Sequence, residues 1–183
     1  MKIIVGLGNP GKQYELTRHN VGFLAIDYFL KDHPAISCQG KFKAQICEIH
    51  FPSEHGLIKT FFVKPETFMN LSGEAVQEIT SFYKADPSTD LLIVHDDKDL
   101  EFGKIKFTDS SGSAGQNGVQ NIIDLLGTKK FHRIRIGVES REPDSPLSTS
   151  DFVLQKFTDE ELKQLNETLL PETNKLIEQF LAK

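Results

Sequence analysis

Two hydrophobic periodicities alternate along this chain. Short apolar or strictly alternating segments are typical of strands, whereas apolar residues spaced three and four apart are typical of helices. The strand pattern occurs in six segments, at 2–7, 42–50, 57–63, 91–95, 104–108 and 132–138. The helix pattern occurs in four, at about 21–31, 72–84, 117–126 and 158–182. Strands that alternate with helices predict an α/β fold built on a central sheet.

Local signals refine this prediction. The segments 42–50 and 57–63 have the spacing of a hairpin, so the sheet is expected to be mixed rather than fully parallel. Thr158 and Glu161 have the spacing of a capping box, which predicts the start of the C-terminal helix, and Pro171 predicts two helices or a kink there. The polar segment 139–151 reads as an exposed loop and not as a domain boundary. We therefore expect one compact domain spanning 1–183, with a twisted mixed sheet flanked by helices and a C-terminal helix.

Bulk properties limit where such a protein works. No segment of the 183 residues approaches the ~20 apolar residues of a membrane span, so no membrane association is expected. The first residues run directly into a motif, which leaves no room for a cleavable signal. Cys38 and Cys47 have neither metal-binding nor redox spacing and are expected to be reduced thiols. Together these features predict a cytoplasmic protein.

The charge distribution bears on nucleic-acid binding. A net charge of −5 argues mildly against a large basic footprint. Lysines and arginines nevertheless cluster in 98–108 and 128–141, while acidic residues concentrate in 139–183. Such a local basic face is compatible with weak, salt-sensitive contacts to phosphates, although ordinary solvated surface explains the charges equally well.

The first candidate for chemistry follows the apolar run 3–5. There the loop Gly6–Gly11 and its continuation carry an amide in Asn9, a guanidinium in Arg18 and an imidazole in His19. A loop at the carboxyl end of a buried strand commonly presents functional groups. These are suitable groups for acyl or ester chemistry.

The same loop also fits a dinucleotide-binding fingerprint, with glycines at positions 6, 8 and 11 and Asp27 near the place of a ribose-binding acid. That fingerprint requires a helix directly after the last glycine, whose amides hold the pyrophosphate. Pro10 removes one amide, and 12–19 is polar, with the apolar helix pattern beginning only at Val21. A dinucleotide-dependent enzyme is therefore the less favoured alternative.

Three further segments carry polar groups at predicted strand or helix ends: 64–73, the acidic run 95–99, and the small-residue loop 110–118. A purely structural role, as a helix cap or an ordinary connection, would also explain each of them. At consecutive strand ends of one α/β sheet, however, they would converge on the edge where such sheets bind ligands. No serine or cysteine lies in a nucleophile-elbow setting, so hydrolysis by an activated water is favoured over covalent catalysis.

Taken together, these segments resemble bacterial-type peptidyl-tRNA hydrolases. The similarity covers nearly the whole chain and is weakest over about 33–60 and at the C-terminal tail. The matching segments are GLGNPGKQYELTRHNVGF at 6–23, KPETFMNLSGEAV at 64–76, VHDDKDLEFGKIKF at 94–107, GQNG at 115–118, FHRIRIGVE at 131–139 and DFVLQKF at 151–157.

The resemblance implies hydrolysis of the ester that joins a peptide to the 3′ ribose of tRNA. It implies His19 as the base that activates water and Asp96 as the carboxylate that orients it. It also implies no cofactor, no metal, a monomer, and peptidyl-tRNA as partner. Substrate contacts are implied for six further residues, Asn9, Tyr14, Phe68, Met69, Asn70 and Asn117. Core packing explains Phe68 and Met69 about equally well. Contacts to tRNA phosphates are expected from Lys104, Lys106, Arg133 and Arg135.

Some positions depart from the family pattern. Ala114 and Gln116 stand where the family commonly has glycine and histidine in its Gly-Gly-His-Asn-Gly turn. Lys98 replaces a common leucine, and Thr108 stands where a basic residue is frequent. These departures affect two expectations: the mobility of the loop 109–113, which we call the gate loop, and the strength of the contact with tRNA. A non-catalytic RNA-binding homologue of the same fold therefore remains an alternative hypothesis.

Overall fold

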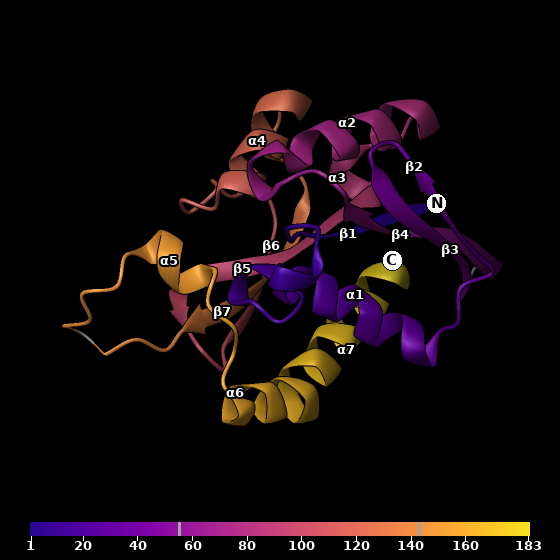
Figure 1. Ribbon diagram of the computed structural model, residues 1–183. Coiled ribbons are helices and arrows are strands. Elements are labelled where there is room, and N and C mark those ends of the chain that lie inside the picture. The colour runs from indigo at the N-terminus through magenta and orange to yellow at the C-terminus, as the bar shows by residue number, and fades with distance from the viewer. Residues whose placement is uncertain (55, 143) are drawn as a thin grey trace.

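The computed structural model describes residues 1–54, 56–142 and 144–183. Within these ranges, seven strands form one sheet in the order β2-β3-β4-β1-β5-β7-β6 (Figure 1). The strands are β1 (Lys2–Gly6), β2 (Ser37–Lys41), β3 (Ala44–Ser53), β4 (Gly56–Pro65), β5 (Leu91–Glu101), β6 (Ile105–Thr108) and β7 (His132–Glu139).

The sheet is mixed, as the sequence predicts. β1 pairs in parallel with β4 and β5, and β5 pairs in parallel with β7. β2 and β3, β3 and β4, and β6 and β7 pair antiparallel. The carboxyl ends of β1, β4, β5 and β7 therefore lie at one edge of the sheet, where the polar segments that follow them come together.

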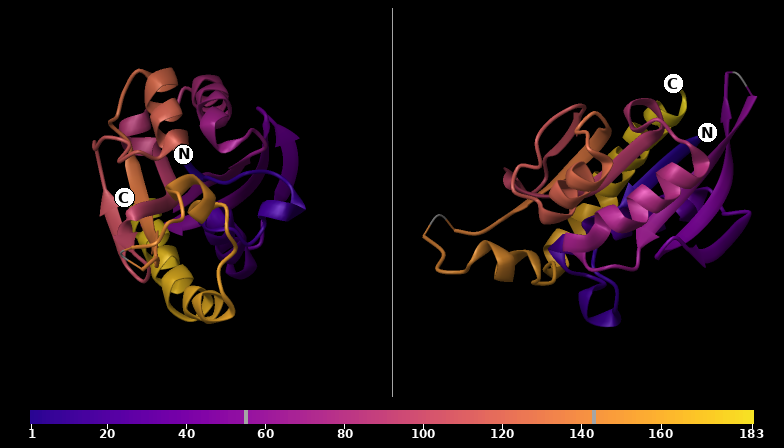
Figure 2. Two further views of the ribbon diagram at one scale, coloured as in Figure 1. Left: turned by 60° about the vertical axis from the view of Figure 1, so that its left-hand side comes forward. Right: turned by 90° about the horizontal axis from the view of Figure 1, so that it is seen from above.

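Helices cover both faces of the sheet (Figure 2). They are α1 (Val21–Asp32), α2 (Ser72–Tyr83), α3 (Pro87–Asp90), α4 (Asn117–Leu126), α5 (Thr149–Val153), α6 (Asp159–Gln164) and α7 (Leu170–Leu181), with short 3-10 turns η1 (Lys12–Tyr14), η2 (Arg18–Asn20) and η3 (Met69–Leu71). α1 and α7 bury their apolar sides against one face, where Phe29 and Phe180 join the core. α2 and α4 cover the other face through residues such as Ile79 and Ile122. The predicted fold class is confirmed.

The C-terminal segment resolves the alternatives left open at Pro171. The capping box of Thr158 and Glu161 is present and begins α6. A π-helical stretch, Leu165–Leu169, then leads into α7, and Pro171 lies in the first turn of α7. A proline is tolerated there because the first helical N–H groups have no intrahelical partner. The structure therefore has two helices, α6 and α7, joined by a π-helical segment.

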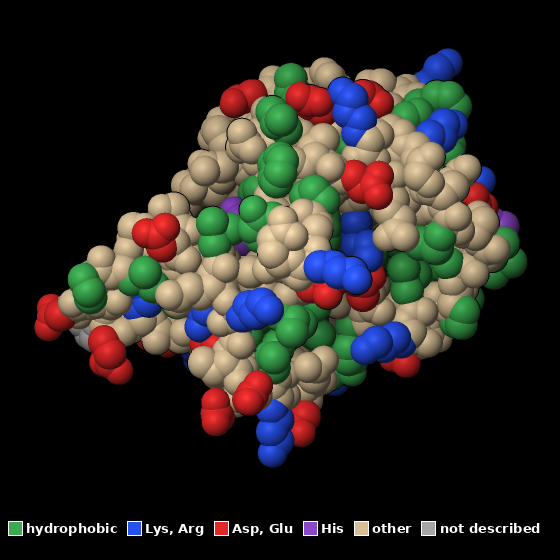
Figure 3. Space-filling model, in the orientation of Figure 1, with side chains coloured by type: hydrophobic (Ala, Val, Ile, Leu, Met, Phe, Trp, Pro, Cys, Tyr) green, Lys and Arg blue, Asp and Glu red, His purple; other side chains and the backbone are tan. Residues whose placement is uncertain are grey.

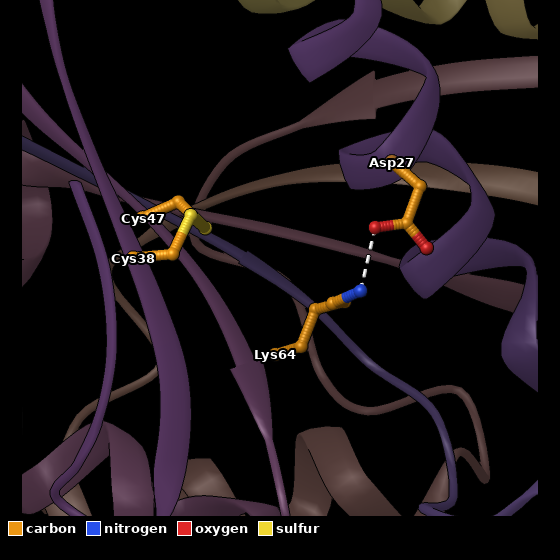
Figure 4. Close-up of a disulfide and its surroundings, with 4 residues drawn as sticks. All are labelled: Asp27, Cys38, Cys47 and Lys64. Carbon is orange, nitrogen blue, oxygen red and sulfur yellow. Dashed lines mark hydrogen bonds and ion pairs between the residues drawn. A yellow bond between two sulfur atoms is a disulfide. The ribbon is translucent and has the colours of Figure 1, made fainter. Parts of the chain in front are cut away.

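The expectation of reduced thiols is wrong: Cys38 and Cys47 form a disulfide (Figure 4). β2 and β3 pair antiparallel through the tight turn at Phe42 and Lys43, and this register places the two cysteines directly opposite each other, with 4.1 Å between their Cα atoms. A sequence separation of nine does not reveal that pairing. The cytoplasmic location loses one of its supports and stays a prediction.

Two further expectations about strands need adjustment. β2 was not predicted, because all five of its residues are exposed and it carries no apolar alternation. β5 runs to Glu101 instead of stopping at 95, so the acidic run lies within a strand, with a register irregularity between Asp97 and Glu101. Among the described residues, no helix combines the length and apolarity needed to cross a membrane.

Candidate active site

A cavity of about 600 Å³ opens at the carboxyl edge of the parallel strands. Its walls come from the loop after β1, from η3, from β5, from the turn before α4 and from α5. On the face of the molecule shown in Figure 3, hydrophobic side chains are interspersed with acidic and basic ones. The sequence-predicted residues that line the cavity are His19, Asp96, Asn9, Phe68, Met69, Asn70 and Asn117.

His19 and Asp96 form the central pair of this cavity. Nδ1 of His19 lies 2.8 Å from Oδ2 of Asp96. The side chain of His19 is 14% exposed and that of Asp96 is 3% exposed. His19 belongs to η2, directly before α1, and Asp96 belongs to β5, so a short turn and a central strand of the sheet fix the two groups. Because Nδ1 donates to the carboxylate, Nε2 carries the free lone pair of the imidazole.

The two groups shift each other's pKa. Burial lowers the pKa of His19, but the negative charge of Asp96 and its hydrogen bond outweigh burial, so this pKa is raised above its ordinary value. Burial raises the pKa of Asp96, but attraction to His19 and hydrogen bonds from His19 and Gln116 outweigh it, so this pKa is lowered. Asp96 therefore stays ionised, and the raised pKa of His19 means that its imidazole loses its proton at a higher pH than a free imidazole does.

Asn9 is fixed by two neighbours. Its backbone N–H donates to Oδ1 of Asn20 at 2.8 Å, and Nδ2 of Asn20 donates to the Asn9 carbonyl at 2.9 Å. Its own Oδ1 accepts the Met69 N–H at 2.8 Å. Within the part of the chain that the structure describes, Nδ2 of Asn9 has no partner and remains a donor for a ligand. Asn20 was missed by sequence reasoning, although its place beside His19 was a signal.

The remaining predicted substrate contacts fall into two groups. Phe68, Asn70 and Asn117 are exposed at the cavity, with Asn70 in η3 and Asn117 at the first position of α4. Met69 lines the cavity but is only 4% exposed, so it also packs in the core. Tyr14 lies in η1 and lines neither this cavity nor the neighbouring cavity beside α1.

Gln116 lines the cavity and contacts the central pair, which the sequence did not reveal. Its Nε2 donates to Oδ1 of Asp96 at 3.0 Å, and its Oε1 accepts the Val119 N–H at 2.8 Å. The same side chain therefore caps α4 and fixes the Asp96 carboxylate, which is in turn hydrogen-bonded to His19. The departure from the family turn at this position was a signal, but only the fold shows that the side chain reaches β5.

The four predicted phosphate contacts have different environments. Lys104 and Lys106 are exposed. Arg135 forms an ion pair with Asp97 at 2.5 Å. Arg133 has no exposed surface: its guanidinium donates to the Gly112 carbonyl at 2.8 Å and to Ser111. Arg133 thus holds the gate loop, and the phosphate-contact prediction stays best suited to the two lysines.

Arg18, beside His19, anchors the η2 turn to α6 and to the segment before it. Nη2 of Arg18 donates to both carboxylate oxygens of Glu161, at 2.9 and 2.7 Å, and Nη1 of Arg18 donates to the Lys156 carbonyl at 2.8 Å. Its guanidinium also lies over the ring of Phe152, at 4.4 Å from the centroid. Arg18 is 4% exposed, so these contacts replace its hydration.

His95 is buried in the same cavity wall. Its Nδ1 donates to the Asp96 carbonyl at 2.7 Å, and complete burial is the main cause that lowers its pKa to about 4. His95 is therefore neutral at pH 7 and supports the backbone of Asp96. Among the described residues, no three His, Cys, Asp or Glu side chains are grouped as metal ligands.

The geometry after Gly11 does not suit the dinucleotide alternative. The chain enters the short turn η1 there, and α1 begins only at Val21. Asp27, the candidate ribose-binding acid, lies on α1 and forms an ion pair with Lys64 at 2.5 Å (Figure 4).

Comparison with known proteins agrees with this site. The sequence profile of the family described as "Peptidyl-tRNA hydrolase" matches residues 3–183. The chain belongs to the peptidyl-tRNA hydrolase family. It is 43% identical to the peptidyl-tRNA hydrolase of Fusobacterium nucleatum over 178 residues, covering 97% of this chain and 88% of that protein. It is 47% identical to that of Caldanaerobacter subterraneus over 169 residues, covering 92% and 87%.

Solved structures give the same result. The crystal structure of peptidyl-tRNA hydrolase from Acinetobacter baumannii at 1.00 Å resolution superposes with a TM-score of 0.79 at 29% identity, covering 97% of this chain and 94% of that one. A peptidyl-tRNA hydrolase complex with N-propanol superposes with a TM-score of 0.83 at 30% identity, covering 98% and 90%. The predicted family, and with it the assignment as a hydrolase, is confirmed.

Proposed function

We propose that this chain hydrolyses the ester between a peptide and the 3′ ribose of tRNA, with His19 as general base and Asp96 as its orienting carboxylate. The observation that carries the proposal is the 2.8 Å hydrogen bond between these two side chains inside a 600 Å³ cavity. Membership of the peptidyl-tRNA hydrolase family supports the substrate class.

The reaction uses water as the nucleophile. Nε2 of His19 removes a proton from a water molecule, which attacks the ester carbonyl, and Asp96 stabilises the imidazolium that forms. The imidazolium then returns the proton to the 3′ oxygen of the ribose as the ester bond breaks. A positioned general base contributes about 100- to 10,000-fold to such a rate.

Asparagine side chains supply the remaining polar groups. Nδ2 of Asn9 is available to donate, and Asn70 and Asn117 are exposed at the cavity wall. A neutral amide both donates and accepts, so it binds peptide backbone without reading side chains. Contacts to backbone groups that only a peptide possesses would also spare free aminoacyl-tRNA.

The test is release of labelled peptide from an N-blocked aminoacyl-tRNA by the wild type and by His19→Ala, with unblocked aminoacyl-tRNA as the control substrate. We expect rapid release by the wild type, from the blocked substrate only, and at least about a 100-fold loss in His19→Ala. His33→Ala is the matched control, because His33 follows α1 and lines neither cavity. Binding of tRNA without release by the wild type would instead support the non-catalytic RNA-binding homologue.

A monomer that works in the cytoplasm remains part of this proposal. Light scattering of the purified protein tests the first point, and fractionation of the source cells tests the second.

A further inference from the structure

Lys98 is the one lysine or arginine among the described residues that line the catalytic cavity. It follows the acidic pair of β5, and its side chain is 35% exposed. A Cβ placed on Gly115 would lie 3.6 Å from Cε of Lys98. The lysine stem therefore lies against the turn that leads into α4, on the wall that also carries Asn117.

The acidic groups around Lys98 are mostly neutralised by other partners. Asp96 is paired with His19, and Asp97 accepts from Arg135 at 2.5 Å. Among the described residues, the ammonium group of Lys98 pairs with Asp99 alone, at 2.6 Å, and the Asp99 side chain is 54% exposed. Exposed ion pairs of this kind contribute little free energy, so the ammonium group of Lys98 can exchange Asp99 for a stronger anion.

The proposed substrate brings such an anion to this place. The ester bond lies on the 3′ side of the terminal ribose, and the 5′-phosphate of the same nucleotide lies on the other side of that one sugar ring. When the ester reaches His19, this phosphate must lie within or at the rim of the cavity. A phosphate held there needs a cationic partner, because its desolvation is otherwise costly.

We propose that Lys98 binds the 5′-phosphate of the 3′-terminal nucleotide and so positions the ester against His19. The inference rests on the proposed function but concerns one subsite of the cavity. The contact is a point-charge contact of an ammonium group, in which one phosphate oxygen replaces Asp99. It distinguishes a nucleotide end from a bare nucleoside ester.

The test uses binding, so it does not depend on turnover. Adenosine 5′-monophosphate and adenosine are titrated into the wild type and into Lys98→Met, and the ratio of their two dissociation constants is measured by NMR. We expect the wild type to prefer the monophosphate by about tenfold, the effect of one charge-assisted contact, and Lys98→Met to lose most of that preference. Lys98→Arg should keep it, because the positive charge remains.

Lys175→Met is the matched control, since Lys175 is exposed on α7, outside both cavities. It should keep the wild-type ratio. An unchanged preference in Lys98→Met, an absence of preference in the wild type, or no binding of either compound at millimolar concentration would each overturn the proposal.

A second measurement separates this subsite from the proposed function. The 3′ ester of an N-acetylated amino acid is offered on adenosine and on adenosine 5′-monophosphate, and the ratio of kcat/KM values is compared. We expect the ratio to fall by about tenfold in Lys98→Met, mainly through KM. Hydrolysis of both esters with an unchanged ratio would overturn the phosphate contact while supporting ester hydrolysis. A preference for the monophosphate in binding, without any hydrolysis, would support the contact and overturn the reaction.

Discussion

Gln116 donates its side-chain amide to Oδ1 of Asp96 at 3.0 Å, so this carboxylate is held from both sides, by Gln116 on one oxygen and by His19 on the other. His19, Asp96 and Gln116 therefore form a chain of three groups from η2, β5 and the N-cap of α4. In the proposed reaction Gln116 contacts Asp96 and not the base itself, so it acts as a positioning residue.

Replacement of Gln116 by Met should lower kcat by about tenfold, the effect of losing one hydrogen bond to a charged group. Without this donor, the negative charge of Asp96 is no longer partly satisfied by Gln116. The carboxylate then attracts the His19 imidazolium more strongly, so the pKa of His19 should rise. The rising limb of the pH–rate profile should accordingly move to higher pH. Gln77→Met is the control, because Gln77 is exposed on α2 and its side-chain amide donates to the Leu125 carbonyl, outside the cavity. An unshifted limb with a lower Tm would assign Gln116 to helix capping alone.

The Asp96→Asn variant should have the opposite effect on the pH profile. Burial lowers the pKa of His19, whereas the charge of Asp96 and its hydrogen bond raise it. Without the carboxylate, burial dominates and the limb moves to lower pH. The plateau rate should nevertheless fall by about 1,000-fold or more, since an amide neither stabilises the imidazolium nor fixes the tautomer. A limb that stays in place would contradict the assignment of His19 as the titrating base.

Arg133 should control the order of the gate loop. In Arg133→Met the carbonyls of Ser111 and Gly112 lose their buried partner, so amide hydrogen exchange over 109–115 should accelerate by about tenfold. The loss of global stability should be smaller than for a fully satisfied arginine, because Nε of Arg133 is itself buried without a partner among the described residues. Lys129→Met, at an exposed position, is the control. Exchange that is unchanged in the loop would refute the role of Arg133.

Reduction of the Cys38–Cys47 disulfide should destabilise the fold without loss of activity. The closed loop is short, and chain entropy predicts a loss of about 2–3 kcal/mol. Neither cysteine lines either of the two cavities described above, so ester hydrolysis at 25 °C should be retained. Thermal unfolding with and without reductant, beside Cys38→Ser, provides the measurement. A reductant-independent Tm would mean that the pair is not oxidised in the purified protein.

The sequence specifies the central part of the fold more completely than its edges. Ile3, Val5 and Leu92 lie in strands buried on both sides, so their apolar runs were a direct signal. β2 has no buried residue and owes its pairing to the neighbouring strand, which no local pattern reveals.

The site shows the same division. His19 and Asp96 were predicted as site residues because a loop motif and a strand end carry them, and in the structure they form a hydrogen-bonded pair in the cavity. Arg133 was expected to contact tRNA phosphates, yet its side chain is fully buried and donates to the gate loop. Gln116 reaches Asp96 across 20 residues of chain. Contacts of this kind depend on tertiary packing, which local periodicity does not encode.

The attachment of Arg18 has a consequence for the order in which the active centre is assembled. Synthesis reaches His19 well before the residues that hold its neighbour Arg18, because Lys156 and Glu161 follow Arg18 by 138 and 143 residues. A growing chain that stops short of residue 156 can already contain His19 and Asp96 and still lack the contacts that fix the η2 turn. The proposed general base is thus made long before the residues that lock it in place.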